Sequence, residues 1–402
     1  MIIHFVYTEC RSPGPFKKES GFKVKSAVVP ELFSTDSESS VTSRKDLVER
    51  AVANLASYNP PDISPLVPRA EFDSHAKSWI YTELAQNADL VGDTDKPQLR
   101  SFLFARMFTS GYAGGRARNP FHEGYIFEAK DWRAFSDLCN TFTYPLKARP
   151  ADLVESVGWQ SPRGDVELEA NELRSSDLFE IHSFEERLDS RVRPAIFGDV
   201  ESAHWTLSRY CDSLKDFAGF GLELENESDF YDWVSLLSHL VPARAAWQMS
   251  FSDIWRKPRQ ESNVGSSWHF FRGPSDHEVP SDEAQEWAKL VMSSFELGIE
   301  MELLTLLDSL GDKFYVGRNQ ISAGLTLVPL AYLLLDEALF PDDREQEDWG
   351  ALDLLQTMTP PAQWEKPQFK QELLDRVADP SNTRLSQNQK QELASWLASV
   401  PA

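Results

Sequence analysis

The first third of the chain alternates apolar and polar positions, which is the pattern of half-buried β-strands. In the clearest stretch, Phe22, Val24 and Ser26 alternate with Lys23 and Lys25. A helical period appears only twice in this part of the chain. Strands are predicted at Ile2–Thr8, Phe22–Ser26, Lys77–Leu84, Ser101–Phe108 and from Phe121 to Phe127, and helices at Arg44–Tyr58 and Trp132–Cys139. Together these elements predict an α+β domain built on a mixed sheet.

The middle of the chain combines the alternation typical of strands with the three-to-four-residue period typical of helices. Short runs with strand character alternate with two stretches in which apolar residues recur every three or four positions. We predict strands at Arg193–Asp199, Ala245–Ser252 and Trp268–Arg272, and helices at Glu201–Phe217 and Asp229–Leu240. The expected buried positions of the first helix are Trp205, Leu207, Cys211 and Leu214. This succession predicts a small α/β unit.

From Ser281 onward the pattern is helical throughout. Ser281 is a preferred N-cap, and Ser386 followed by Gln389 fits a capping box. Six helices are predicted, beginning at Ser281, Glu300, Ile321, Trp349, Lys366 and Ser386. The most apolar run, Ile321–Phe340, is interrupted by Pro329 and by two acidic residues, so it predicts a buried helix and not a membrane span.

The predicted fold class is therefore α+β with three parts. They are an N-terminal mixed-sheet domain over residues 1–146, a small central α/β domain over 147–272 and a helical C-terminal domain over 273–402. A chain of 402 residues is long enough for each part to have its own core.

Charge and cysteine content narrow the possible partners. The net charge is −23, so the surface would repel phosphates, and general nucleic-acid binding is not expected. The three cysteines Cys10, Cys139 and Cys211 lie far apart and do not form a disulfide pattern, which fits a reducing cytosol. The first residues lack the basic and apolar regions of a signal peptide. We expect a cytoplasmic protein that does not bind membranes.

The stretch Gly111–Phe127 holds the candidate binding residues. Glycines allow the backbone conformations of a sharp turn, and a turn followed by arginines can form a nest for a phosphate or a carboxylate. The candidates for binding an anion or a partner are Gly114, Gly115, Arg116, Arg118, Asn119 and His122. The simpler interpretation, which we favour, is a tight turn whose arginines pair with carboxylates of the protein itself.

Other candidate residues have simple structural interpretations. Asp73 and His75 can share a strand face as a fragment of a metal site, but no third ligand is identifiable. Cys139 and Cys211 fall on apolar helix faces, where cysteine is usually inert. Asp199 precedes a helix and fits an N-cap. The sequence contains no P-loop, HExxH, CxxC pair or GxSxG motif, so we expect no cofactor, no metal and no catalytic residue.

Two parts of the chain resemble a known family. The opening, with its strand ending at Tyr7-Thr8 and its later Gly-Phe-x-Val-x-Ser strand, resembles the N-terminal domain of the bacterial GTPase-associated protein family, and the stretch Gly111–Phe127 looks like a Gly-Arg-x-x-Asn-Pro segment of that family. In the middle domain, the family's Leu-Pro…Arg…Phe-Ser pattern is filled by Leu240, Pro242, Arg244, Phe251 and Ser252. The resemblance covers roughly Met1 to Trp255. His122 stands one residue after Phe121, earlier than in the family's segment.

The resemblance implies a non-enzymatic scaffold or adaptor of a bacterial antiphage conflict system, which binds a GTPase encoded nearby and effector proteins. Two alternatives stay open. One is a hydrolase or nuclease acting through the turn at 114–118 with Asp73 and His75. The other is a toxin or its neutralising partner, for which the acidic composition is the only support.

Overall fold

The computed structural model describes two compact units of the chain. One comprises Met1–His182, Gly221–Phe230 and Ser250–Ser275, and the other comprises Ser183–Phe220, Tyr231–Met249 and Asp276–Ala402. Within them the described residues are 2–10, 21–28, 78–84, 101–109, 112–113, 116–117, 120–128, 188–216, 219–222, 224, 227–246, 249–252, 269–272, 279–315, 321–340, 345–358, 363–364, 366–380 and 384–401.

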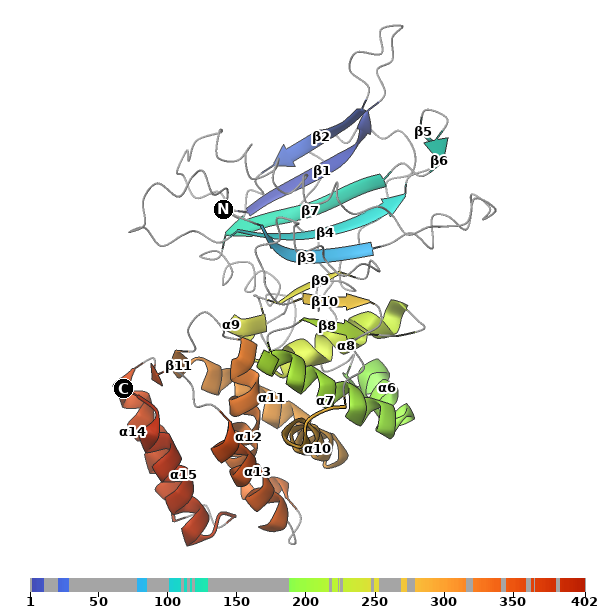
Figure 1. Cartoon of the computed structure of the whole chain (residues 1–402). Helices are drawn as coiled ribbons and strands as arrows, with labels where there is room; N and C mark the ends of the chain where they lie inside the picture. The colour runs from blue at the N-terminus through green and yellow to red at the C-terminus, as the bar shows by residue number, and fades with distance from the viewer. Residues whose placement is uncertain are drawn as a thin grey trace, which may run out of the picture. The chain divides into compact units, whose positions relative to one another are not determined.

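The first unit is built on an eight-stranded sheet with the order β2-β1-β7-β4-β3-β9-β10-β8 (Figure 1). The strands are β1 (Ile2–Cys10), β2 (Gly21–Val28), β3 (Ser78–Leu84), β4 (Ser101–Thr109), β7 (Pro120–Glu128), β8 (Phe220–Leu222), β9 (Ser250–Ser252) and β10 (His269–Arg272). All pairings from β2 to β3 are antiparallel, whereas β8, β9 and β10 form a small parallel sheet. The described strands of residues 1–146 pair with one another only in antiparallel fashion, so a mixed sheet within that part is not confirmed. The parallel pairing comes from β8, β9 and β10, which the sequence analysis assigns to the central domain.

The core of this sheet is visible on its central strands. Phe102, Leu103, Phe104 and Ala105 of β4 are buried, and Ile126 of β7 is buried opposite Leu103. All the strands predicted before residue 128 are confirmed in type. The two helices predicted at 44–58 and 132–139 lie outside the described residues, and the domain boundaries at 146 and 272 stay predictions.

The second unit is helical. Its helices are α6 (Arg193–Gly198), α7 (Val200–Asp216), α8 (Glu227–His239, which begins in the first unit), α9 (Ala243–Ala246), α10 (Asp282–Glu296), α11 (Glu300–Gly311), α12 (Ala323–Leu333), α13 (Glu345–Thr357), α14 (Pro367–Ala378) and α15 (Gln387–Ser399). A π-helix at Leu188–Val192 precedes α6, a 3-10 helix η9 (Glu337–Leu339) follows α12, and β11 (Phe314–Tyr315) pairs with β12 (Gln363–Trp364). The described part of the chain is thus mostly helical.

The helical core is centred on α12. Every residue of α12 is buried, including Pro329, which confirms the buried helix predicted for this apolar run. Trp287 of α10, Tyr210 of α7 and Tyr332 of α12 are the largest fully buried side chains of this unit. Because large apolar side chains contribute most to burial, these three fix how α7, α10 and α12 pack.

Two buried glycines let α11 and α12 approach the segment that follows α8. A Cβ placed on Gly324 would lie 2.4 Å from the carbonyl oxygen of Leu240, and one on Gly311 would lie 2.2 Å from the Cβ of Pro242. Both distances are far below van der Waals contact, so only glycine fits at either position. Leu240 and Pro242 belong to the pattern that carries the family resemblance, and the structure gives them a packing role.

Three local predictions are wrong. The segment predicted as a strand at Arg193–Asp199 is helix α6, because Pro194 stands at its first turn, where proline favours a helix start. The strand predicted at Ala245–Ser252 begins only at Ser250, since the preceding backbone closes the short helix α9 on the carbonyl of Pro242. Trp205, predicted to be buried, is 41% exposed.

The helical caps agree with the sequence. Ser281 caps α10 by accepting a hydrogen bond from the backbone N–H of Ala284, and Ser386 and Gln389 form the predicted capping box of α15. Asp199 accepts a hydrogen bond from the N–H of Ser202 at 3.1 Å, which confirms its predicted role at the start of α7. In the described residues no helix is long and apolar enough to cross a membrane.

Candidate functional groove

A groove of about 470 Å³ opens on the helical unit. Three elements far apart in the sequence form it: the outer face of α11, the turn from α12 into η9, and α14. Its lining residues are Met301, Glu302, Thr305, Leu306, Ser309, Leu335, Asp336, Leu339 and Arg376. We call the surface formed by these residues the α11 groove.

The floor of the α11 groove comes from the side of α11 that faces away from the core. The core side of the helix carries Leu303, Leu304, Leu307 and Leu310, all of which are buried. Met301 and Leu306 lie off that stripe and are half-buried. Apolar side chains on the outer face of a helix leave apolar surface in contact with water, which is favourable to cover.

The second wall is the turn between α12 and η9. Asp336 accepts a hydrogen bond from the backbone N–H of Ala338 at 3.0 Å through Oδ1. This contact holds the chain as it changes direction after α12 and places Leu335 and Leu339 beside the floor. Asp336 is exposed, so its carboxylate is open to solvent beside this turn.

Two arginines attach the third wall, α14 and the residues after it, to the end of α12. Arg376 donates a hydrogen bond to the carbonyl of Leu334 at 2.7 Å, and Arg384 donates one to the carbonyl of Tyr332 at 2.7 Å. The guanidinium of Arg384 also stacks over the ring of Phe340, 3.7 Å from its centroid. Positive charge is favourable at a helix C-terminus, where carbonyls lack partners. This wall is therefore firmly placed.

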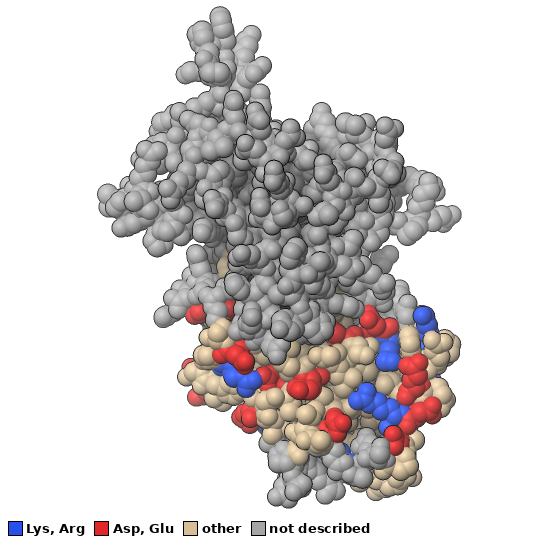
Figure 2. Space-filling model, turned by 180° about the vertical axis from the view of Figure 1, so that it is seen from behind, with Lys and Arg blue, Asp and Glu red and all other residues tan. Residues whose placement is uncertain are grey.

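Negative side chains outnumber positive ones in the α11 groove. Glu302 and Asp336 each contribute a carboxylate, and Arg376 contributes the one guanidinium among the lining residues, which is already bonded to a carbonyl. Figure 2 shows one face of the helical unit, where acidic, basic and uncharged side chains are interspersed. The groove thus combines four apolar side chains with a rim that is negative on balance.

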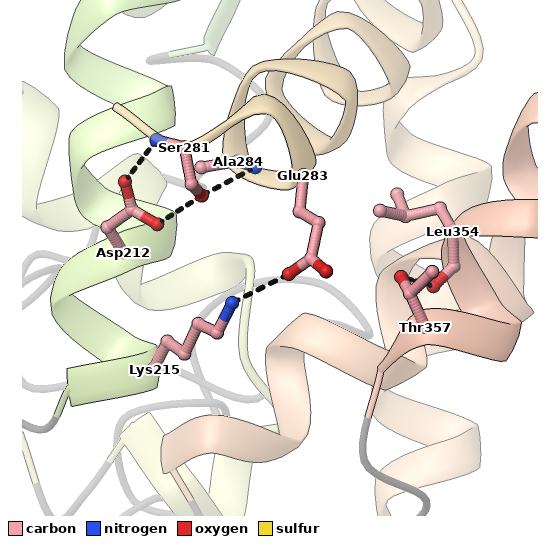
Figure 3. Close-up of polar contacts among 7 residues, drawn as sticks. All are labelled: Asp212, Lys215, Ser281, Glu283, Ala284, Leu354 and Thr357. Atoms are coloured by element: carbon pink, nitrogen blue, oxygen red, sulfur yellow. Dashed lines mark hydrogen bonds and ion pairs between the residues drawn. The ribbon is translucent and has the colours of Figure 1, made fainter. Parts of the chain in front are cut away.

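A polar network joins α7 and α10, and its role is structural (Figure 3). Asp212 accepts hydrogen bonds from the N–H of Ser281 at 2.9 Å and from its hydroxyl at 2.6 Å. Lys215 forms an ion pair with Glu283 at 2.6 Å, and this hydrogen bond raises the pKa of Lys215. Each contact joins α7 to the first turn of α10, so the network fixes the two helices against each other.

An ion pair between a half-buried arginine and a buried glutamate supports the start of α11. Arg193 of α6 pairs with Glu300, whose side chain is 3% exposed, and also donates to the carbonyl of Phe295. Burial raises the pKa of Glu300, and the neighbouring guanidinium acts against that rise. A carboxylate at the first residue of a helix is favoured by the helix dipole as well. The pair holds α6 and the floor of the groove together.

The first unit contains a buried serine–histidine pair. On the parallel strands β9 and β10, the Oγ of Ser250 lies 2.6 Å from the Nδ1 of His269. Both residues are buried, and burial lowers the pKa of His269 to about 3. A nucleophile and its base must be reachable by a substrate, whereas Ser250 is 1% exposed. The pair is a satisfied polar contact of the sheet.

The predicted site residues fall mainly outside the described part. Gly114, Gly115, Arg118 and Asn119 lie outside the described residues, as do Asp73, His75 and Cys139. Arg116 is in the short strand β6 (Arg116–Ala117), opposite Ala113 of β5 (Tyr112–Ala113), and His122 is in β7, opposite Tyr7 and Met107. The anion-binding turn and the Asp73/His75 pair therefore stay predictions.

Cys211 also lies in the described part. It is buried in α7, and burial raises the pKa of its thiol, as the interpretation of a structural cysteine requires.

The sequence pattern does not reveal the α11 groove. Its only local signal is the pair Met301 and Leu306, which are apolar at positions outside the buried stripe of α11. Among the residues that the structure describes, no group of three or more His, Cys, Asp and Glu side chains could hold a metal ion. Comparison with protein-family models, with curated proteins and with solved structures finds no match to the chain.

Proposed function

We propose that this protein is a non-enzymatic scaffold or adaptor that binds other proteins, and that the α11 groove is one of its binding surfaces. The observation that carries the proposal is the groove itself: an open surface whose four apolar side chains are buried or half-buried and whose three charged side chains are exposed. Protein interfaces have this arrangement, in which an apolar centre supplies most of the affinity and a polar rim surrounds it.

The sequence resemblance supports a more specific proposal. It implies a cytoplasmic component of a bacterial antiphage system, with a GTPase encoded nearby as a partner and effector proteins as others. In this proposal the chain has three parts, a mixed-sheet domain at 1–146, an α/β domain at 147–272 and a helical domain at 273–402, of which the helical part presents the α11 groove.

Co-expression tests the proposal. The full chain, tagged, is expressed together with the genes that flank it, and the purified material is separated by size-exclusion chromatography. We expect a stable complex of defined stoichiometry that includes the GTPase. If the chain migrates as a lone monomer beside a well-expressed GTPase and the other neighbours, the proposal is wrong.

A further inference from the structure

We propose that the α11 groove takes a short amphipathic helix from a partner protein, with its apolar face against Met301, Leu306 and Leu339 and with Lys or Arg beside Glu302 and Asp336. This inference rests on the proposed function and adds the chemistry of the bound segment. It is carried by the length, the lining and the charge of the groove.

The length of the floor matches two helical turns. The lining residues of α11 run from Met301 to Ser309, which at 1.5 Å per residue is roughly 12 Å. A helix bound in a groove presents anchors at i, i+3 or i+4 and i+7, which span about the same distance. A segment of this size therefore meets the whole floor.

The lining suits apolar anchors of varied shape. Leu335 and Leu339 line the wall formed by the α12–η9 turn, and Met301 and Leu306 lie on the floor formed by α11. Methionine is flexible and polarisable, so it adapts to the side chain that it meets. A volume of about 470 Å³ is sufficient for two or three side chains, and the groove is open along its length, unlike the enclosed sites of small molecules.

The charge of the groove predicts which residues flank the apolar face of the bound helix. Glu302 and Asp336 lie at the rim, and the guanidinium of Arg376 is engaged with the carbonyl of Leu334. The whole chain carries a net charge of −23, which attracts a basic segment and repels an acidic one before contact is made. A basic amphipathic helix thus fits both the local rim and the overall charge.

The test uses two designed peptides and the full-length chain. One is a helical peptide of about 14 residues with Leu at i, i+4 and i+7 and Lys on both flanks of that stripe, and the other has Glu in place of each Lys. Binding is measured by fluorescence anisotropy of a labelled peptide. We expect the Lys peptide to bind at least tenfold more tightly than the Glu peptide, with a smaller difference at high salt.

Three variants locate the site. Thr305→Arg places a long charged side chain in the groove and is expected to weaken binding of the Lys peptide at least tenfold. Glu302→Lys reverses one rim charge and is expected to weaken binding of the same peptide about fivefold. The matched control is Glu296→Lys, which makes the same charge change at an exposed position of α10 outside the groove and should leave binding within twofold. Circular dichroism of each variant checks that the fold is retained.

Several outcomes would overturn the inference. Equal binding of the two peptides, binding of neither, or loss of binding in Glu296→Lys as large as in Glu302→Lys would each do so. Self-association in ultracentrifugation that Thr305→Arg abolishes would identify a second copy as the occupant, and would also overturn it. If the GTPase complex forms but neither peptide binds, the inference fails and the proposed function stands. If the Lys peptide binds but no complex forms, the inference stands and the proposed function fails.

Discussion

At the scale of single residues, two glycines show most directly how close packing constrains this chain. Gly324 and Gly311 let α12 and α11 touch the segment Leu240–Pro242, where any side chain would overlap backbone or proline atoms. The sequence does not single out either position, because a glycine inside a helical pattern gives no sign of what lies against it.

We predict that Gly324→Ala destabilises the helical unit by about 2 kcal/mol, because the new methyl group meets the carbonyl of Leu240 and the core must shift. The measurement is urea unfolding followed by circular dichroism. Gly350→Ala is the control: nothing lies within 4 Å of a Cβ at that helical position, so alanine should stabilise by up to about 1 kcal/mol. Equal changes in the two variants would contradict the packing argument.

A second residue-scale prediction concerns pH. The pKa of His269 is lowered to about 3 in the fold, while an unfolded histidine titrates near 6.5. Below about pH 6.5 the unfolded chain binds a proton that the folded chain does not, so this histidine lowers stability by about 1.4 kcal/mol per pH unit as the pH falls toward 3. Glu300, whose pKa is raised, acts in the opposite direction.

The comparison of wild type with His269→Gln isolates that effect, since Glu300 and every other group are common to both. Urea unfolding is measured from pH 7 to pH 4. The free energy of unfolding should fall less steeply with decreasing pH in the variant, and the difference in slope should correspond to close to one bound proton. Parallel curves would mean that His269 is charged or exposed in solution.

At the scale of elements, the contact between α7 and α10 shows how polar groups set the position of a helix. Ser281 caps α10 through the N–H of Ala284, and its own N–H and hydroxyl donate to Asp212 of α7 (Figure 3). A cap side chain that is itself held by the neighbouring helix fixes both the start of α10 and its register against α7.

We predict that Asp212→Ala costs about 1 to 2 kcal/mol of stability, because two hydrogen bonds to a carboxylate are lost. Lys215→Ala should cost 0.5 kcal/mol or less, roughly, since the pair with Glu283 is half-exposed and screened by water. Hydrogen exchange of the first turn of α10 should rise in the first variant only. A larger effect from Lys215→Ala would reverse this ranking of the two contacts.

At the scale of the whole molecule, local signals predict the elements well and the site poorly. The cap of α10 and the capping box of α15 depend on neighbours in the sequence, so the amino-acid pattern alone is sufficient to predict them. It is not sufficient for Arg193–Asp199, because the apolar residues there fit a strand or a helix and only Pro194 and the buried pair with Glu300 favour the helix. The α11 groove needs three distant segments, and no local pattern describes how they meet.

The anchoring of α14 has a consequence for how such a protein can evolve. Arg376 and Arg384 donate hydrogen bonds to the main-chain carbonyls of Leu334 and Tyr332, so these hydrogen bonds do not depend on which side chains occupy those positions. Point substitutions at Leu339 or Thr305 can therefore change the lining of the α11 groove while these two hydrogen bonds are retained. In the adaptor role proposed above, the partner specificity of the groove could change in this way without loss of the fold.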